Sequence, residues 1–308
     1  MRFILSLLLF SVLAACFGPG RDAPDLVRFI ALGDAPYGDP AEVDAPYKAL
    51  LAKISDSNPP LVIHVGDLHG VRDCGDTRLD QLRGYLNSIA APVLYTPGDN
   101  EWTDCAGSSV GAFDPLERLA HIRKTYFGTD TTLGAKPVPS KHQGTIGYPE
   151  NRRLRIGTVG FITVHVVGSN NNFSTTDLDA VREFMKRNDA NVRWLNDSFA
   201  AFADADAIVV ALHADMFIPT GGFQNGWWPN SPFRDIGVTL GQQSSALEKP
   251  VLLLYGDSHV HKDFKPFPKH RPFLHAIEVF GYPDIKAIEI TVDPTRKKPF
   301  RVSKELSP

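Results

Sequence analysis

The sequence lacks an excess of charge of either sign, and it lacks repeats. Its 32 Lys and Arg residues are nearly balanced by 35 Asp and Glu residues, so the formal net charge is −3, and these residues are dispersed along the chain. A basic face that binds nucleic acid by releasing counter-ions is therefore not expected. With 308 residues, 43% of them hydrophobic, the chain can bury a sizeable core, and no periodic segment indicates a solenoid.

Cysteine is also scarce, and one of the three cysteines belongs to a targeting segment. Arg2 precedes an apolar run, Phe3 to Leu13, which is too short to span a bilayer comfortably. The run ends in Leu13-Ala14-Ala15-Cys16, which resembles the lipobox of bacterial lipoproteins. The resemblance implies a signal peptide over residues 1–15, a lipidated Cys16, a tether over residues 16–26, and export to a bacterial membrane facing the periplasm or cell surface. A plain signal peptide beside a chance cysteine is the alternative.

The other two cysteines, Cys74 and Cys105, form an even pair in a chain expected to reach an oxidising compartment. Each follows a Gly-Asp motif by six or seven residues. If those motifs meet in space, the loops that carry the cysteines meet too. We predict a disulfide between them, with two independent buried thiols as the alternative.

Short apolar or β-branched runs, bounded by glycine, proline or aspartate, predict buried strands. These runs are Val27–Leu32, Leu61–Val65, Pro92–Thr96, Phe161–Val167, Ala207–Leu212, Val251–Tyr255, Phe273–Val279 and Ile285–Val292. Helical spacing marks Ala45–Ser55, Arg78–Ala90, Pro115–Tyr126 and Leu178–Ala203. The alternation predicts βαβ units early in one domain, residues 27–308, and more antiparallel strands late. Two basic segments, Lys262–Arg271 and Arg296–Lys304, are interpreted as solvated faces.

Five of the predicted strands end in turns that hold aspartate or histidine. Because ligands of α/β sheets bind beyond the carboxyl ends of strands, these turns are expected to converge. A single Gly-Asp turn is more often an Asx-turn or helix cap, but five in series favour a shared site. The turns are Gly33-Asp34, Gly66-Asp67, Gly98-Asp99-Asn100-Glu101, His213, and Gly256-Asp257-Ser258-His259-Val260-His261.

Carboxylates and imidazoles gathered in this way favour a metal centre. In one cleft they would repel one another or stay poorly satisfied unless a cation neutralised them. A mixed Asp/His set suits zinc, iron or manganese. Two ions are expected, since one carboxylate can bridge both while the others complete each coordination shell.

The ordered set resembles the calcineurin-like metallophosphoesterase superfamily, which includes the purple acid phosphatases. The match runs from about Phe29 to Lys262, with about thirty residues between each of the first three motifs. The resemblance implies an α/β fold, a four-layer αββα sandwich with mixed sheets. It also implies hydrolysis of a small phosphate ester, mono- or diester, by water activated between two ions. A monomer is expected.

The resemblance also assigns roles to individual side chains. Asp34 and His261 would hold the first metal and Asp67 would bridge. Asp99, His213 and His259 would hold the second. Pro36 stands where the family commonly has a histidine in the first motif and offers no side-chain ligand, so Tyr37 or His69 would complete the first metal.

The third motif departs from the family's usual Gly-Asn-His followed by an acid. Asp99 replaces the asparagine as a charged ligand, but Asn100 cannot donate a proton as histidine does. Leaving-group protonation would then come from Glu101, His69 or His165, while Asn100 is a candidate to hydrogen-bond the phosphate. Ser258, in place of a glycine before His-x-His, is a smaller departure.

Two other functions compete with this interpretation. Gly107–Gly111 matches the Gly-x-Ser-x-Gly pattern of serine hydrolases, but the polar segment before it is not the strand that a nucleophile elbow needs. A degenerate metallophosphoesterase fold, kept as a surface lipoprotein that binds a ligand or partner, is the stronger alternative, and Pro36 and Asn100 motivate it. Two loops, Gly168–Asn172 and Gly221–Trp228, are either contacts to the site or ordinary turns.

Overall fold

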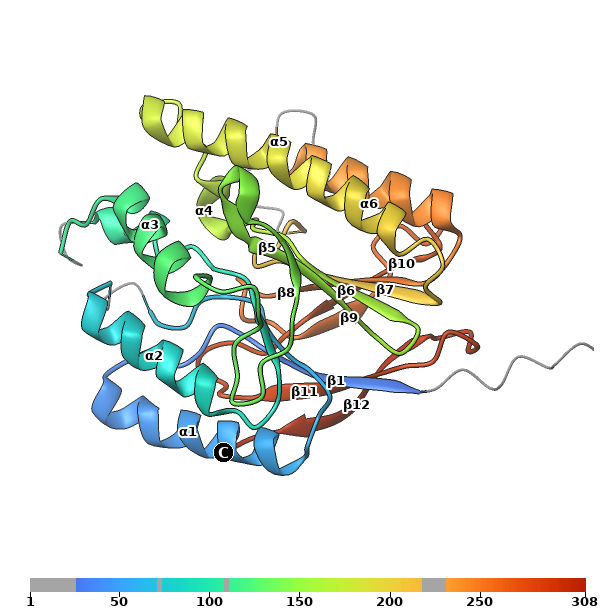
Figure 1. The fold of residues 1–308 in the computed structure, drawn as a ribbon, viewed down its shortest axis with the longest axis horizontal. Helices are drawn as coiled ribbons and strands as arrows, with labels where there is room; N and C mark the ends of the chain where they lie inside the picture. Colours follow the sequence, from blue (N-terminus) through green and yellow to red (C-terminus); the bar gives the residue numbers. More distant parts are fainter. Residues whose placement is uncertain (1–25, 71–73, 108–110, 218–230) are drawn as a thin grey trace, which may run out of the picture.

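The computed structural model describes residues 26–70, 74–107, 111–217 and 231–308. In these ranges two mixed β-sheets pack face to face, and helices cover both outer faces (Figure 1). The predicted four-layer αββα arrangement is confirmed. The signal peptide, Cys16 with the rest of the tether up to residue 25, residues 108–110 and the whole Gly221–Trp228 loop lie outside the described residues.

The first sheet has the strand order β12-β11-β1-β2-β3. Its strands are β12 (Phe300–Leu306), β11 (Ala287–Val292), β1 (Val27–Leu32), β2 (Val62–His64) and β3 (Val93–Tyr95). The last three are parallel to one another, whereas β11 is antiparallel to both β1 and β12. The parallel part therefore brings the carboxyl ends of β1, β2 and β3 to the same edge.

The second sheet has the order β4-β5-β6-β7-β8-β10-β9. Its strands are β4 (Lys141–Gln143), β5 (Tyr148–Ile156), β6 (Val159–Thr163), β7 (Ala207–Ala211), β8 (Val251–Tyr255), β10 (Leu274–Glu278) and β9 (Lys262–Phe264). The central run from β6 through β10 is parallel, and the flanking strands are antiparallel. The ends of β7 and β8 consequently share an edge.

Three apolar clusters hold the layers together. The inner cluster joins the two sheets and includes Phe29 and Phe161, whose ring centroids lie 5.2 Å apart. The second packs the first sheet against α1 (Pro40–Asp56), α2 (Asp76–Ser88) and α3 (Pro115–Tyr126). The third packs the other sheet against α5 (Leu178–Ala201) and α6 (Arg234–Leu247). Burial of these faces fixes the sheets relative to one another.

Several elements were not predicted from the sequence. They are β4, β5, β9, β12 and α6, together with three short helices, η1 (Thr103–Ala106), η3 (Gly144–Ile146) and α4 (Gly168–Asn171). The interpretation of Arg296–Lys304 as a solvated face misses β12, which pairs with β11 as an edge strand whose basic side chains remain exposed. Edge strands tolerate such charges, so their apolar signal is weak.

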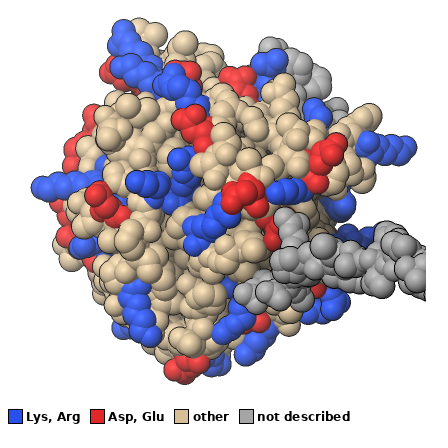
Figure 2. All heavy atoms as spheres, turned by 45° about the vertical axis from the view of Figure 1, so that its right-hand side comes forward, with Lys and Arg blue, Asp and Glu red and all other residues tan. Residues whose placement is uncertain are grey.

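Charged residues of both signs are interspersed on the face shown in Figure 2. Among the described residues, no helix has both the length and the apolar character required to cross a bilayer.

Candidate metal centre

The candidate site lies where the carboxyl ends of strands from both sheets meet. Asp34 follows β1, Asp67 follows β2, His213 follows β7 and Asp257 follows β8. The three aspartates have positive φ angles of 52°, 55° and 79° in chain order. Such backbone is uncommon outside glycine and persists where the surroundings enforce it, often at functional sites. The predicted convergence of these turns is therefore present in the structure.

Two glycines allow the carboxylates to approach so closely. A Cβ atom on Gly98 would lie 2.0 Å from Asp67 Oδ1, and one on Gly256 would lie 2.2 Å from Asp34 Oδ2. Any side chain at either position would displace a carboxylate, so the turns that carry Asp34 and Asp67 each require the glycine of another Gly-Asp turn.

His213 is the centre of the carboxylate cluster. The side chain is fully buried, and its Nδ1 lies 3.0 Å from the carbonyl oxygen of Val65. Its Nε2 lies 3.0 Å from Asp99 Oδ1, 3.4 Å from Asp67 Oδ1 and 3.9 Å from Asp257 Oδ1. The backbone carbonyl thus fixes the ring so that Nε2 faces the acids, as is common for metal-ligating histidines.

The same arrangement recurs at His259. Its Nδ1 lies 3.0 Å from the carbonyl oxygen of Tyr282, and its Nε2 lies 3.7 Å from Asp34 Oδ1. His261 instead places Nδ1 2.6 Å from the carbonyl oxygen of Glu278 and stacks on Phe280. The prediction that His261 accompanies Asp34, with His259 at the other end, is therefore wrong: His259 occupies the position beside Asp34.

Asp257 was missed as a site residue. Its carboxylate, with Asp99 and His213, forms a group whose potential ligand atoms all lie within 4.8 Å of one another; a second such group contains Asp34, Asp67 and His213. The two side chains of this turn that face the cluster are thus Asp257 and His259, which stand two residues before the predicted His259 and His261. The available sequence signal was Gly256 directly before Asp257, whereas the prediction had Ser258 in the place of that glycine.

Tyr37 and Asn100 both contact Asp67. The Tyr37 hydroxyl donates to Asp67 Oδ2. The Asn100 amide Nδ2 lies 2.7 Å from the same oxygen, 2.8 Å from Tyr37 Oη and 3.0 Å from the His69 carbonyl oxygen. The amide hydrogens of Asn100 therefore have partners within the protein. This geometry supports a role in orienting Asp67 and Tyr37 and does not support the prediction that Asn100 hydrogen-bonds the phosphate.

Glu101 binds backbone N–H groups of two motifs. Its fully buried carboxylate accepts hydrogen bonds from the backbone N–H groups of Asp67, Leu68 and Gly98 at 3.2, 2.5 and 2.7 Å. It joins the second and third motifs through their backbones. This geometry does not support the prediction that Glu101 protonates a leaving group.

The other two predicted proton donors are buried histidines. His69 places Nδ1 2.7 Å from the carbonyl oxygen of Gly70, and its buried Nε2 has no hydrogen-bond partner among the described residues. His165 places Nδ1 2.9 Å from Glu150 Oε1, and Arg123 binds the same carboxylate. Burial lowers the pKa of His165 to about 4. His165 thus belongs to an internal network with Glu150 rather than to the carboxylate cluster.

The internal network of His165 predicts acid sensitivity. The unfolded chain protonates this histidine below about pH 6.5, whereas the folded protein protonates it only near pH 4. Because only the unfolded chain takes up this proton, we expect His165 to lower the free energy of unfolding by about 3 kcal/mol as the pH falls from 6.5 to 4. His165→Gln retains a donor for Glu150 and should flatten this part of the stability curve in urea unfolding at several pH values. Exposed His270→Gln is the control, and an unchanged pH slope in His165→Gln would contradict the assignment.

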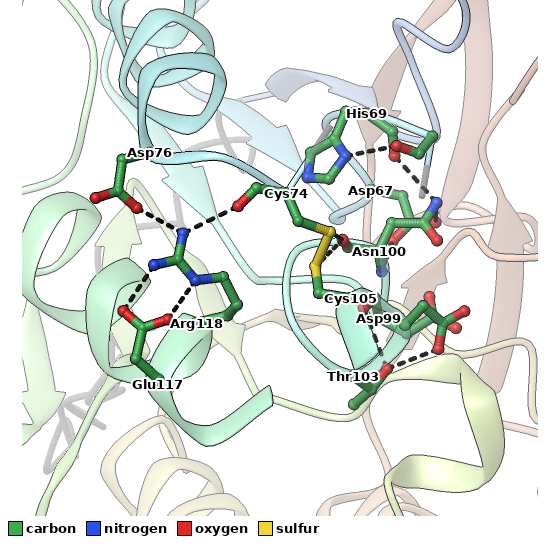
Figure 3. Close-up of a disulfide and its surroundings, with 12 residues drawn as sticks. Asp67, His69, Cys74, Asp76, Asp99, Asn100, Thr103, Cys105, Glu117 and Arg118 are labelled. Carbon is green, nitrogen blue, oxygen red and sulfur yellow. Dashed lines mark hydrogen bonds and ion pairs between the residues drawn. A yellow bond between two sulfur atoms is a disulfide. The ribbon is translucent and has the colours of Figure 1, made fainter. Parts of the chain in front are cut away.

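The predicted disulfide is confirmed: Cys74 and Cys105 are bonded, with their Cα atoms 5.8 Å apart. Figure 3 shows the bridge beside Asn100, whose carbonyl oxygen lies 3.2 Å from Cys105 Sγ. Arg118 donates to the Cys74 carbonyl oxygen at 2.9 Å from the opposite side. The bridge therefore ties the segment after Asp67 to the segment after Asp99, two turns that converge on the site.

The cluster has the properties of a cation site. Burial raises the pKa of Asp34 to about 8, with further increases from Asp257 and Glu278, and its buried Oδ2 has no partner in the described part of the chain. Burial likewise raises the pKa of Asp257 to about 7. Burial opposes protonation of His213, but Asp67 and Asp99 raise its pKa well above the usual range. Four carboxylates face only two imidazoles, His213 and His259, which leaves a negative excess that a metal ion would neutralise, and their donor atoms suit one.

Comparison with known proteins bears on the fold and the family of the chain. A dimetal phosphatase from Danio rerio superimposes with a TM-score of 0.53 at 11% identity, covering 91% of this chain and 98% of that one. A 5'-nucleotidase from Candida albicans gives a TM-score of 0.48 at 12% identity, covering 89% of this chain and 50% of that one. No curated protein shows a significant match. The model of the calcineurin-like phosphoesterase family matches residues 27–263, most of the chain. The chain therefore belongs to the calcineurin-like phosphoesterase family.

Proposed function

We propose that this protein is a metal-dependent hydrolase of phosphate mono- or diesters. The observation that carries the proposal is the convergence of Asp34, Asp67, Asp99, His213 and Asp257 at the joined strand ends of the two sheets. Family membership supports phosphoester hydrolysis as the chemistry.

We assign the ligands by position in the cluster. Asp34 and His259, with Tyr37, would hold a cation at one end, while Asp99, His213 and Asp257 would hold one at the other. Asp67 lies between the ends, because Oδ2 contacts Tyr37 and Oδ1 faces His213. When bound, the two cations would lower the pKa of a water and stabilise negative charge on phosphoryl oxygens.

The remaining polar residues hold this arrangement in place. Asn100 orients Asp67 and Tyr37, and Glu101 fixes the backbones that carry Asp67 and Gly98. His69 is the remaining candidate to protonate the leaving group, since its Nε2 has no partner among the described residues and it follows Asp67 by two positions. Because Nδ1 donates to the Gly70 carbonyl oxygen, Nε2 of neutral His69 carries no hydrogen. His69 could therefore donate a proton from Nε2 only as an imidazolium.

The test is turnover of p-nitrophenyl phosphate and bis(p-nitrophenyl) phosphate. Metal-free protein should be inactive, and added Mn²⁺, Zn²⁺ or Fe²⁺ should restore hydrolysis of at least one ester. A panel of nucleotide, sugar-phosphate and phospholipid-headgroup esters would then define the substrate. If protein shown by metal analysis to be fully loaded turns over none of them, the proposal fails and the ligand-binding alternative is supported.

We propose further that the protein is an exported lipoprotein. The Leu13–Cys16 sequence after an apolar run and the Cys74–Cys105 disulfide support export to an oxidising compartment. Mass spectrometry of the mature N-terminus would show a lipidated Cys16, whereas an unmodified N-terminus at another residue would contradict the lipid anchor.

A further inference from the structure

The Asp99 end of the cluster has an unusually oxygen-rich donor set. Asp99, His213 and Asp257 place potential ligand atoms within 4.8 Å of one another. Asp67 adds a further oxygen 3.4 Å from His213 Nε2. Three carboxylates therefore accompany a single imidazole. A cation at this end would meet mostly hard, negatively charged oxygen ligands.

Asp257 is held so that only one of its oxygens faces the cluster. Its Oδ2 accepts a hydrogen bond from the backbone N–H of Asp215 at 3.0 Å, while Oδ1 lies 3.9 Å from His213 Nε2. Gly168 lies against this oxygen, since a Cβ there would fall 2.6 Å from Asp257 Oδ1 and 2.7 Å from Asp99 Oδ2. The absence of a side chain at Gly168 lets the two carboxylates approach from different sheets.

A lysine fixes the loop behind Asp257. Lys262 Nζ donates to Asp215 Oδ2 at 2.8 Å, to Glu278 Oε2 at 2.7 Å and to Ser258 Oγ at 3.0 Å. The Asp215 and Glu278 side chains are fully buried. Lys262 therefore compensates two buried acids while 37% of its side chain stays exposed, so it is both part of the predicted solvated face and a partner of the buried acids. Asp257 is consequently positioned by its surroundings rather than free to swing away.

Carboxylates and imidazoles favour different cations. Carboxylate oxygens suit Mg²⁺, Ca²⁺ and Mn²⁺, whereas zinc binds readily to imidazole nitrogen, and zinc ordinarily binds more tightly than manganese at a given site. We propose that Asp257, together with Asp67 and Asp99, shifts this end of the centre toward hard, oxygen-preferring divalent cations and narrows the usual advantage of zinc over manganese. The inference rests on the proposed metal-dependent function and names Asp257 as the residue that sets the preference.

The experiment measures metal affinity rather than turnover. Metal-free protein is titrated with Mn²⁺ and with Zn²⁺ against a chromophoric chelator, and bound Mn²⁺ is followed by electron paramagnetic resonance. Asp257→His should raise the ratio of zinc to manganese affinity at one of two sites by about tenfold or more, which corresponds to about 1.4 kcal/mol. Asp257→Asn keeps the shape and an acceptor for the Asp215 N–H, and it should weaken Mn²⁺ binding without a gain for zinc.

Asp197→His is the matched control, because it adds the same imidazole to an exposed position of α5. This control should leave the ratio of zinc to manganese affinity unchanged at both sites of the centre. Folding of each variant is checked by circular dichroism. A folded Asp257→His with an unchanged ratio, or an Asp257→Asn with wild-type Mn²⁺ affinity, would overturn the inference. If the metal affinities shift as expected but no ester is hydrolysed, the proposed function is refuted and the inference about Asp257 stands.

Discussion

Replacing Asp67 with asparagine is expected to reduce kcat/KM for phosphate esters by more than about 100-fold. Even residues that only orient metal ligands cost 10–100-fold when changed, in typical metalloenzymes, and Asp67 lies between the two ends of the cluster with one oxygen toward each. The amide also replaces one acceptor oxygen by a donor opposite Asn100, which donates to both Asp67 oxygens. Steady-state kinetics would measure the loss of kcat/KM, and metal analysis of the same preparation would measure the loss of bound metal.

The metal-free Asp67→Asn protein should have nearly the stability of the metal-free wild type, because the loss of a buried charge offsets the amide donor placed opposite Asn100. Burial and the neighbouring acids raise the pKa of Asp67, so its charge costs the folded state free energy when no cation is present. The stabilisation by added metal, seen as a rise in Tm, should be largely lost. Asp197→Asn on exposed α5 serves as the control. Wild-type kcat/KM in Asp67→Asn would refute the central role of this carboxylate.

Replacing Glu101 with glutamine is expected to lower the free energy of unfolding by about 2–4 kcal/mol, because a buried polar group loses its partner. Three backbone N–H groups point at the Glu101 carboxylate. A glutamine side chain offers only one oxygen, so its own NH₂ must face at least one of these donors. Urea denaturation would measure the change.

Catalysis should fall in Glu101→Gln as well, since the displaced backbones carry Asp67 and border Asp99. Glu305→Gln, at an exposed position of β12, should change stability by less than about 0.5 kcal/mol and is the comparison. A Glu101→Gln protein as stable as this control would show that the backbone N–H groups find other partners. Reduced stability with wild-type turnover would separate a structural role from positioning of the site.

Local sequence patterns were enough for the central strands and for most helices. The apolar runs that became β1, β7 and β8 are buried on both faces, which gives a signal that does not depend on distant residues. Several strands outside this centre were missed for the opposite reason. Strand β5 carries Asn151, Arg152 and Arg153, whose side chains are satisfied by hydrogen bonds to distant segments, so its composition does not indicate a strand.

The sequence by itself determined that acids and histidines follow successive strands and that these turns belong together, because parallel topology brings strand ends to one edge whatever their details. It also favoured a disulfide between Cys74 and Cys105 over two separate thiols, and the structure contains that bond. Only the tertiary structure decided which side chains face the cluster. Asp257 and His259 both adopt positive φ, and this turn directs them inward while His261 packs on Phe280. Glu101 turns toward three backbone N–H groups from two separate motifs. Such choices depend on backbone torsions and long-range hydrogen bonds, which residue spacing does not specify.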